Sequence, residues 1–384
     1  MRLTQITHHD LDGYGASTVA AACAEVDRVI HVPRYSDVGP VFEEEVKRLT
    51  KAQASETLLM TDLGLEEQTI AGLKRFAAMN KKREGEKHRL VVLDHHASSS
   101  EQLARQGLEP APVAERPGLS RSDFGDPAIT LLIDEDSCAT AMTMTHRALF
   151  ATHEPERQED LAALIAAIDA LDLWRKENAA FPGGIALDEI FWENATGLIP
   201  PGHPWHDRFV SALLLAAGQR LREGATPAQL EQDAVAIRTR IVNDLLADAP
   251  DDDANLTTRS RLARALARSD TLFRPLKDGT LLSFGLDSGM FQRVSDRIME
   301  AGRTKRVVNV QRMGTLSFRS VDGTALDGAR LFRGGGHRDA AGGRLQSGSA
   351  FSLADAIAQV EPVLNPEKPA GSDSPFAALK NWKG

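Results

Sequence analysis

The sequence has little cysteine and no long hydrophobic run. Only two cysteines, Cys23 and Cys138, occur among its 384 residues, too few for a disulfide framework and without the spacing of a metal-binding motif. No apolar stretch approaches the roughly 20 residues of a membrane span, and the first residues turn polar too soon for a signal peptide. These absences predict a cytoplasmic protein without membrane partners, in which both cysteines are small core residues.

Positive charge and aromatic side chains are also scarce. The chain has 45 Lys and Arg against 54 Asp and Glu, a formal net charge of -9, which is the wrong sign for a protein that coats long nucleic acid through phosphate contacts. Aromatic residues make up 5% and leave few platforms for stacking the bases of a long single strand. We therefore exclude long duplex nucleic acid as a partner and expect any anionic ligand to be small and held locally.

Two domains are expected because 384 residues exceed the size at which one hydrophobic core usually stops growing. In the first half, short apolar runs alternate with segments of helical periodicity, which is the βαβ rhythm of a parallel sheet covered by helices. The runs are residues 3–6, 29–32, 58–60 and 90–93. We predict an α/β fold with a parallel-sheet N-terminal domain, a helical connector and a smaller α+β C-terminal domain.

Breaker-rich and acidic stretches suggest where these parts meet. Proline and glycine are dense in residues 181–204, which predicts an irregular connection. Thr226, Pro227 and Gln229 then have the form of a capped helix start. The predicted divisions are a catalytic domain at 1–180, a helical connector at 181–260, a substrate-binding domain at 261–365 and a surface tail at 366–384.

The strongest local motif directly follows the first predicted strand. It contains His8, Asp10 and Asp12, and alternate residues leaving a strand point to the same side. One imidazole and two carboxylates that converge could bind a metal ion. The alternative is that these polar residues only end a strand and begin a turn.

Further His and Asp residues follow other predicted strands. Asp62 comes after the third apolar run, and the fourth ends in Asp94, His95 and His96. Because ligands bind beyond the carboxyl ends of the strands in open α/β sheets, these tips favour one shared cluster. Asp169 and Asp172 then interrupt the end of an apolar helix, where a buried carboxylate is costly unless it meets a cation.

These motifs resemble those of the DHH phosphoesterase superfamily, which is named for the triplet found here as Asp94, His95 and His96. The order His8-x-Asp10-x-Asp12, Asp62, the triplet and Asp169 is similar to the family's. Ser317 to Ser320 and Gly334 to His337 resemble the motifs of the DHH-associated second domain. The resemblance covers about residues 1–175 and 265–350 and implies an active-site cleft between the two domains.

The resemblance implies two Mn²⁺ ions bridged by Asp62, with a shared hydroxide as the nucleophile for attack on phosphorus. Mixed imidazole and carboxylate ligation suits Mn²⁺ better than Mg²⁺, which is the alternative metal. Asp169 is taken as a ligand because it fits the family's fourth position, and Asp172 is the alternative. The implied metal ligands are His8, Asp10, Asp12, Asp62, His95 and Asp169.

Other roles are also implied. Asp94 would orient imidazoles, and His96 would face the phosphate or help to protonate the leaving oxygen. The implied catalytic residues are Asp62, His95, His96 and Asp94. Consecutive glycines let backbone amides approach an anion. The implied substrate-binding residues are Arg319, Ser320, Gly334, Gly335, Gly336 and His337.

The implied function is a Mn²⁺-dependent phosphohydrolase that cleaves phosphodiester bonds of short oligoribonucleotides or dinucleotides. The pattern from Asp169 to Trp174 and the long connector resemble the oligoribonuclease or nanoRNase branch, in which a homodimer is common. Alternatives are a bisphosphate nucleotide phosphatase, a cyclic dinucleotide phosphodiesterase, an exopolyphosphatase and a nucleotide sensor without turnover. Trp192, His203 and His206 are interpreted as packing or capping residues rather than metal ligands.

Overall fold

The computed structural model describes residues 2–114, 116–195, 197–250 and 253–366. The chain divides into two compact units, Met1–Pro250 and Asp251–Gly384. The predicted α/β class is confirmed, since both units combine helices with a mixed sheet. Apart from Pro366, the predicted surface tail at 366–384 lies outside the described residues.

The first unit is built on a seven-stranded sheet whose strand order is β2-β1-β3-β4-β7-β6-β5. The first five strands in that order are parallel, β6 pairs antiparallel with β7, and β5 pairs antiparallel with β6 at the edge of the sheet. The four predicted apolar runs lie in the first four strands of the chain. The strands are β1 (Arg2–His8), β2 (Val26–Val32), β3 (Glu56–Thr61), β4 (Arg89–Asp94), β5 (Ala111–Pro112), β6 (Leu119–Ser122) and β7 (Ile129–Asp134).

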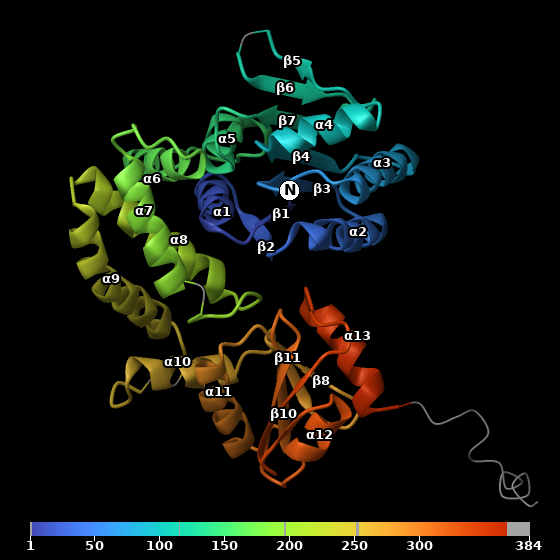
Figure 1. Ribbon diagram of the computed structural model, residues 1–384, viewed down its shortest axis with the longest axis vertical. Coiled ribbons are helices and arrows are strands. Elements are labelled where there is room, and N and C mark those ends of the chain that lie inside the picture. Colours follow the sequence, from blue (N-terminus) through green and yellow to red (C-terminus); the bar gives the residue numbers. More distant parts are fainter. Residues whose placement is uncertain (1, 115, 196, 251–252, 367–384) are drawn as a thin grey trace, which may run out of the picture. The chain divides into compact units, whose positions relative to one another are not determined.

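Helices cover both faces of this sheet (Figure 1). Alternate strand residues such as Leu59 and Val91 pack in one core with Val19 of α1 (Leu11–Cys23) and Met142 of α5 (Ala139–Thr145). The opposite face is covered by α2 (Tyr35–Lys51), α3 (Glu67–Lys82) and α4 (Ala97–Arg105). Residues buried on both faces explain why these strands read as continuous apolar runs.

The remaining helices of the first unit follow the sheet. A 3₁₀ turn (Arg147–Leu149) leads to α6 (Gln158–Asp172), which packs against α8 (Trp205–Arg222), and α8 also contacts α1. As predicted, α9 (Pro227–Ala247) begins with a capping box formed by Thr226 and Gln229. The segment predicted as connector therefore lies, up to residue 250, within the first compact unit.

The prediction of an irregular connection over 181–204 was wrong for its first half. Residues Phe181–Ile190 form α7, and Phe191–Ala195 continue it as a π-helical turn. Pro182 stands in the first helical turn, where its missing N–H costs nothing. A Cβ at Gly184 would lie 2.3 Å from the carbonyl oxygen of Ala167, so glycine permits a close helix contact here and does not break the helix.

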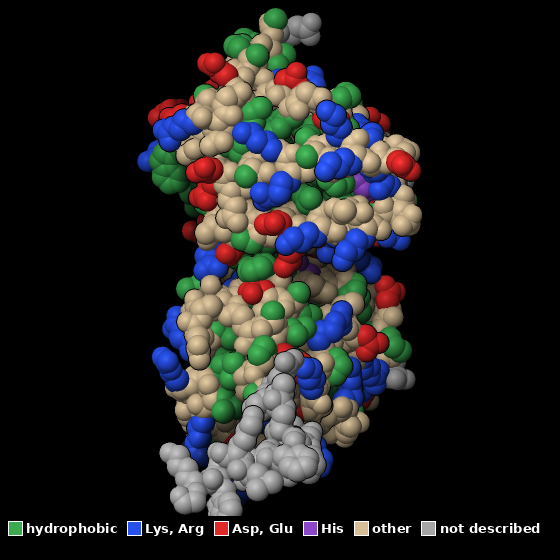
Figure 2. All heavy atoms as spheres, turned by 90° about the vertical axis from the view of Figure 1, so that its right-hand side faces the viewer, with side chains coloured by type: hydrophobic (Ala, Val, Ile, Leu, Met, Phe, Trp, Pro, Cys, Tyr) green, Lys and Arg blue, Asp and Glu red, His purple; other side chains and the backbone are tan. Residues whose placement is uncertain are grey.

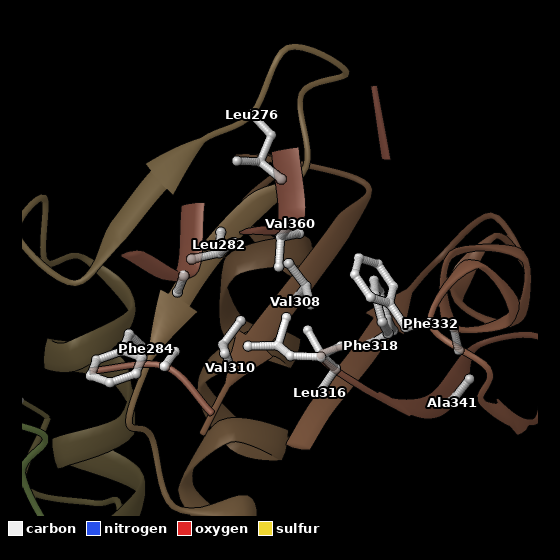
Figure 3. Packing of buried hydrophobic residues seen from close by; sticks show 14 of the residues in the cluster. Leu276, Leu282, Phe284, Val308, Val310, Leu316, Phe318, Phe332, Ala341 and Val360 are labelled. Carbon is white, nitrogen blue, oxygen red and sulfur yellow. The ribbon is translucent and has the colours of Figure 1, made fainter. Parts of the chain in front are cut away.

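The second unit contains a six-stranded sheet with the order β12-β13-β11-β10-β9-β8. Its strands are β8 (Phe273–Pro275), β9 (Leu281–Phe284), β10 (Arg306–Val310), β11 (Thr315–Ser320), β12 (Gly335–Gly336) and β13 (Ala340–Arg344). Leu282, Val308 and Phe318 pack in a core with residues of α12 (Ala325–Leu331) and α13 (Leu353–Leu364), as Figure 3 shows. The other helices are α10 (Thr258–Ala267) and α11 (Ser288–Glu300).

On the face shown in Figure 2, Lys and Arg side chains are scattered among acidic and uncharged ones. Within the described ranges, no helix combines the length and the apolar composition needed to cross a membrane.

Candidate metal centre

Neighbouring parallel strands bring the chemistry-bearing residues to one edge of the first unit's sheet. His8 is the last residue of β1, Asp62 directly follows β3, and Asp94 ends β4 just before His95 and His96. Because β1, β3 and β4 are adjacent and parallel, their carboxyl ends lie side by side. The strand order therefore gathers side chains that are far apart in the sequence.

The side chains meet around Asp62. His95 Nε2 lies 3.1 Å from Asp62 Oδ1, and His8 Nδ1 lies 3.9 Å from Asp62 Oδ2. His8 Nδ1 is also 2.5 Å from Asp10 Oδ2, and His95 Nε2 is 3.7 Å from Asp12 Oδ2. Asp172 Oδ2 completes the group at 3.5 Å from His95 Nδ1. We define these six residues as the carboxylate cluster: His8, Asp10, Asp12, Asp62, His95 and Asp172.

Asp62 is held in an unusual backbone conformation at the centre of the carboxylate cluster. Its φ is 58°, in the left-handed region that aspartate tolerates better than most residues, and its N–H donates to Leu93 O at 3.2 Å. The side chain is buried, and Oδ2 accepts no hydrogen bond from any donor in the described part of the chain. A buried carboxylate oxygen without a donor is costly, so this atom fits a position that faces a cation.

Asp10 and Asp12 reach the carboxylate cluster through a helix start rather than an extended strand. The strand ends at His8, Asp10 is the N-cap of α1 with its Oδ1 accepting from Gly13 N, and Asp12 lies in the first turn of α1. The expected alternation of strand side chains beyond His8 was therefore wrong. A Cβ at Gly13 would lie 2.1 Å from His8 O, so glycine is required where the chain turns so tightly.

Asp12 is further anchored by the N-terminus of α5. Its Oδ2 accepts from Ala139 N at 2.7 Å and its Oδ1 from Thr140 N at 2.8 Å. These bonds satisfy orphan amides of that helix start and fix the carboxylate beside His95.

The geometry distinguishes Asp172 from Asp169. Asp169 Oδ2 accepts from Arg175 at 2.7 Å, and its Oδ1 accepts from Cys138 N at 2.9 Å, so its charge is matched by a cationic side chain outside the carboxylate cluster. Asp172 instead faces His95 and has no such cationic partner among the described residues. Of the two alternatives, Asp172 is the one whose carboxylate lies at the carboxylate cluster. The two residues lie three apart at the end of α6, where the sequence pattern alone could not assign their directions.

The carboxylate cluster carries an excess of negative charge, which moves the pKa values of its acids. Burial, together with the charges of Asp10 and Asp12, raises the pKa of Asp62 well above its ordinary value. Burial and the same two charges raise the pKa of Asp172 to about 8. For Asp10, burial also acts upward, but the hydrogen bond and charge of His8 outweigh it and lower the pKa to about 2. Four carboxylates around two imidazoles are an arrangement that a bound cation would stabilise.

Asp94 and His96 form a pair beside the carboxylate cluster. His96 Nδ1 lies 2.7 Å from Asp94 Oδ1, and the hydroxyl of Ser99 donates to Asp94 Oδ2. Burial acts to lower the pKa of His96, but its hydrogen bond to Asp94 and the charge of that carboxylate raise it overall. Asp94 thus lies in hydrogen-bond contact with the imidazole of His96.

Sequence reasoning missed Tyr35, the first residue of α2. Its hydroxyl lies 3.0 Å from His96 Nε2, and its ring stacks on the ring of His8 at a centroid distance of 4.9 Å. The available signal was its position shortly after β2, the one strand of the first four in which we identified no polar tip.

The residues expected to bind substrate lie in the second unit, around β13. Sheet pairing sets Arg319 opposite Ala340, and the N–H of His337 donates to Ala340 O at 2.8 Å. Arg319 is half-buried with its guanidinium over the ring of Phe291, and burial lowers its pKa. His337 is exposed. Arg319 of β11 and His337 of the turn between β12 and β13 therefore lie at neighbouring positions along the chain's pairing with Ala340.

Ser320 and the glycines have structural contacts at the same place. The Ser320 hydroxyl donates to Arg338 O at 3.4 Å and accepts from Ala325 N at 3.0 Å, and Gly335 and Gly336 form β12. A Cβ at Gly334 would lie 1.9 Å from Gly342 O, so close strand pairing alone requires glycine there.

No known protein-family model matches this chain, and neither does any curated protein sequence. Among solved structures, an uncharacterized protein from Helicobacter pylori G27 is similar over 96% of this chain and 100% of its own, with 18% sequence identity and a TM-score of 0.70. A pGpG-specific phosphodiesterase from Vibrio cholerae aligns over 94% of this chain and 98% of its own, with 12% identity and a TM-score of 0.26. The first of these similarities shows a shared fold.

Proposed function

We propose that the carboxylate cluster is the divalent-metal centre of a phosphoesterase that hydrolyses phosphodiester bonds of short oligoribonucleotides or dinucleotides. The observation that carries this proposal is the convergence of four carboxylates and two imidazoles around Asp62, whose buried Oδ2 has no donor among the described residues. Metal-assisted hydrolysis needs such a set of convergent ligands.

The donor set fits Mn²⁺, because that ion accepts both imidazole and carboxylate ligands, with Mg²⁺ as the alternative. His8, Asp10 and Asp62 would hold one ion, and Asp12, Asp62, His95 and Asp172 the other. When bound, a pair of divalent cations supplies Lewis-acid activation of water and of the phosphoryl oxygens.

The other residues of the proposed site bind and orient. Asp94 holds His96 so that the imidazole stays beside the carboxylate cluster, where it can hydrogen-bond a phosphate oxygen or donate a proton to the leaving oxygen. In the second unit, we propose that Arg319 and His337 can bind an anionic group through hydrogen bonds.

The composition of the chain favours a short substrate. A net charge of -9 and an aromatic content of 5% disfavour binding of long polyanions, whereas one metal centre with few local cations suffices for a dinucleotide. The same chemistry would serve a bisphosphate nucleotide phosphatase, a cyclic dinucleotide phosphodiesterase or an exopolyphosphatase. A sensor without turnover is a weaker candidate, because no cluster position is filled by a residue unable to bind metal.

The test is a substrate panel offered to the purified protein with Mn²⁺. The panel contains a linear dinucleotide, a five-residue RNA, 3′,5′-bisphosphorylated adenosine, a cyclic dinucleotide and polyphosphate, with Asp62→Asn as the matched inactive control. We expect mononucleotides from the first two substrates, and none with the variant or with EDTA. Preferred release of phosphate from polyphosphate or from the bisphosphate, or binding without any turnover, would overturn the proposed function.

A further inference from the structure

Tyr35 links two imidazoles that belong to different parts of the proposed site. Its hydroxyl lies 3.0 Å from His96 Nε2. Its ring stacks on His8 with an interplanar angle of 19° and a centroid distance of 4.9 Å. One side chain therefore touches both a proposed metal ligand and the histidine of the Asp94–His96 pair.

The backbone around Tyr35 is fixed by an ion pair at the start of α2. Arg34 donates from Nε and from a terminal nitrogen to the two oxygens of the buried Asp37, at 2.9 and 2.8 Å. A bidentate pair of this kind restricts both side chains. The residues on either side of Tyr35 thus restrain the start of α2.

Tyr35 also ends a continuous line of hydrogen bonds. Leu65 N donates to Ser99 Oγ at 2.8 Å, Ser99 Oγ donates to Asp94, and Asp94 Oδ1 lies 2.7 Å from His96 Nδ1. The hydroxyl of Tyr35 then meets the other ring nitrogen of His96. Because both nitrogens of His96 have partners, the plane of this imidazole is determined by Asp94 on one side and Tyr35 on the other.

We propose that Tyr35 is a positioning residue of this centre, whose hydroxyl fixes the orientation of His96 and whose ring supports His8. The inference rests on the proposed function for its kinetic part. The two contacts are separable, because phenylalanine keeps the ring and loses the hydroxyl, whereas leucine loses both.

The kinetic test compares Tyr35→Phe with Tyr35→Leu, alone and in a His96→Ala background. Loss of one hydrogen bond corresponds to roughly a 2- to 12-fold change, so we expect Tyr35→Phe to lower kcat by about that factor while KM and Mn²⁺ affinity change less than about twofold. Tyr35→Phe should have no further effect once His96 is alanine. A merely structural role would instead reduce kcat by the same factor in both backgrounds, and that result would overturn the proposal.

Two measurements without turnover complete the test. Titration calorimetry should show that Tyr35→Leu binds Mn²⁺ about 10-fold more weakly than the wild type, which is the loss of affinity typical when a residue that contacts a metal ligand is removed. Tyr35→Phe should bind Mn²⁺ with unchanged affinity. In EDTA, Tyr35→Phe should lower the melting temperature by about 2–4 °C with His96 present and by less than that with His96→Ala. Unchanged Mn²⁺ affinity in Tyr35→Leu would overturn the ring contact, and equal melting shifts would overturn the hydroxyl contact.

The control is the chain's other tyrosine. Tyr14 OH lies 2.7 Å from His206 Nε2, so Tyr14→Phe removes the same kind of bond elsewhere in the first unit. It should lower the melting temperature and leave kcat and Mn²⁺ affinity unchanged; an equal loss of kcat would overturn the specific role of Tyr35. If wild-type protein hydrolyses nothing in the panel, the proposed function fails, and the calorimetric and thermal measurements still decide the inference.

Discussion

The first unit contains two groups of histidine and aspartate side chains that differ in how their charges are matched. One is the carboxylate cluster. The other, which we define as the aromatic cluster, consists of Tyr14, His31, His206 and Asp207. In both, potential ligand atoms of at least three His and Asp side chains lie within 4.8 Å of one another. Closeness of such side chains therefore does not by itself distinguish a metal centre from a hydrogen-bonded core.

In the aromatic cluster three of the four imidazole nitrogens have hydrogen-bond or ion-pair partners. Asp207 Oδ1 lies 3.0 Å from His31 Nε2, and His206 Nδ1 donates to Ile199 O at 2.6 Å while its Nε2 meets Tyr14 OH. The ring of Tyr14 stacks on His31 at 3.6 Å. Burial acts to raise the pKa of Asp207, but the hydrogen bond and charge of His31 lower it overall.

The carboxylate cluster shows the opposite balance. It has four acids for two imidazoles, the pKa values of Asp62 and Asp172 are raised, and one buried oxygen lacks a donor among the described residues. The comparison shows that the two groups differ in their ratio of carboxylates to imidazoles, and this excess of carboxylates is what favours the carboxylate cluster as the proposed metal centre.

The largest effect is expected for Asp62→Asn, which removes the central charge of the carboxylate cluster. The rate of hydrolysis should fall by more than roughly 100-fold, which is the most that is typically lost when a residue that only contacts a metal ligand is removed. Mn²⁺ at about 100 times its Kd should raise the melting temperature of the wild type by roughly 5–10 °C and that of the variant hardly at all. Scanning calorimetry with Mn²⁺ and with EDTA measures this, and equal Mn²⁺ stabilisation of both proteins would remove Asp62 from the centre.

The next effect separates the two aspartates of α6. Asp172→Asn should weaken Mn²⁺ binding by about 10- to 100-fold, because its carboxylate faces His95. Asp169→Asn should lower the melting temperature through its contacts with Arg175 and Cys138 and change Mn²⁺ affinity less. Titration calorimetry on both variants decides between them, and the reverse ranking would restore Asp169 as the ligand.

These two residues also show how far the sequence could be interpreted. The strand ends at His8, Asp62 and Asp94 were predictable because buried parallel strands leave a clear apolar pattern and their tips share one sheet edge. The direction of Asp172 was not, since it depends on how α6 packs. Gly183 and Gly184 contributed to the wrong prediction of an irregular connection, because close helix packing rather than a helix break explains these glycines. The role of Tyr35 could not be predicted from its residue type, because a single tyrosine after a strand is common.

A smaller effect concerns pH in the absence of metal. The pKa of Asp172 in the folded protein is raised to about 8 from an ordinary value of 3.8. Between these two pH values the folded state binds more protons than the unfolded state. The free energy of unfolding therefore falls as the pH rises from 3.8 to about 8. Histidines with lowered pKa values, such as His203, add the opposite slope only below about 6.5. Urea unfolding in EDTA between pH 6.5 and 8 should therefore show a decline with pH, to which Asp172 alone contributes at most about 1.4 kcal/mol per pH unit.

The matched control for this pH effect is Asp172→Asn, in which the decline should be shallower. Saturating Mn²⁺ should also flatten it in the wild type, because the cation replaces the proton. A stability that rises with pH over the same interval would contradict the raised pKa values.

The smallest effect is expected in the aromatic cluster. Asp207→Asn keeps a hydrogen-bond acceptor for His31, and the side chain of Asp207 is 40% exposed, so the free energy of unfolding should fall by less than about 1 kcal/mol. The number of Mn²⁺ or Zn²⁺ ions bound per chain should not change, because this cluster has one carboxylate for two imidazoles and so no excess of negative charge to neutralise. Metal analysis after dialysis measures that number. Loss of one ion in this variant would show that the aromatic cluster is a metal site too, and that charge balance does not separate the two groups.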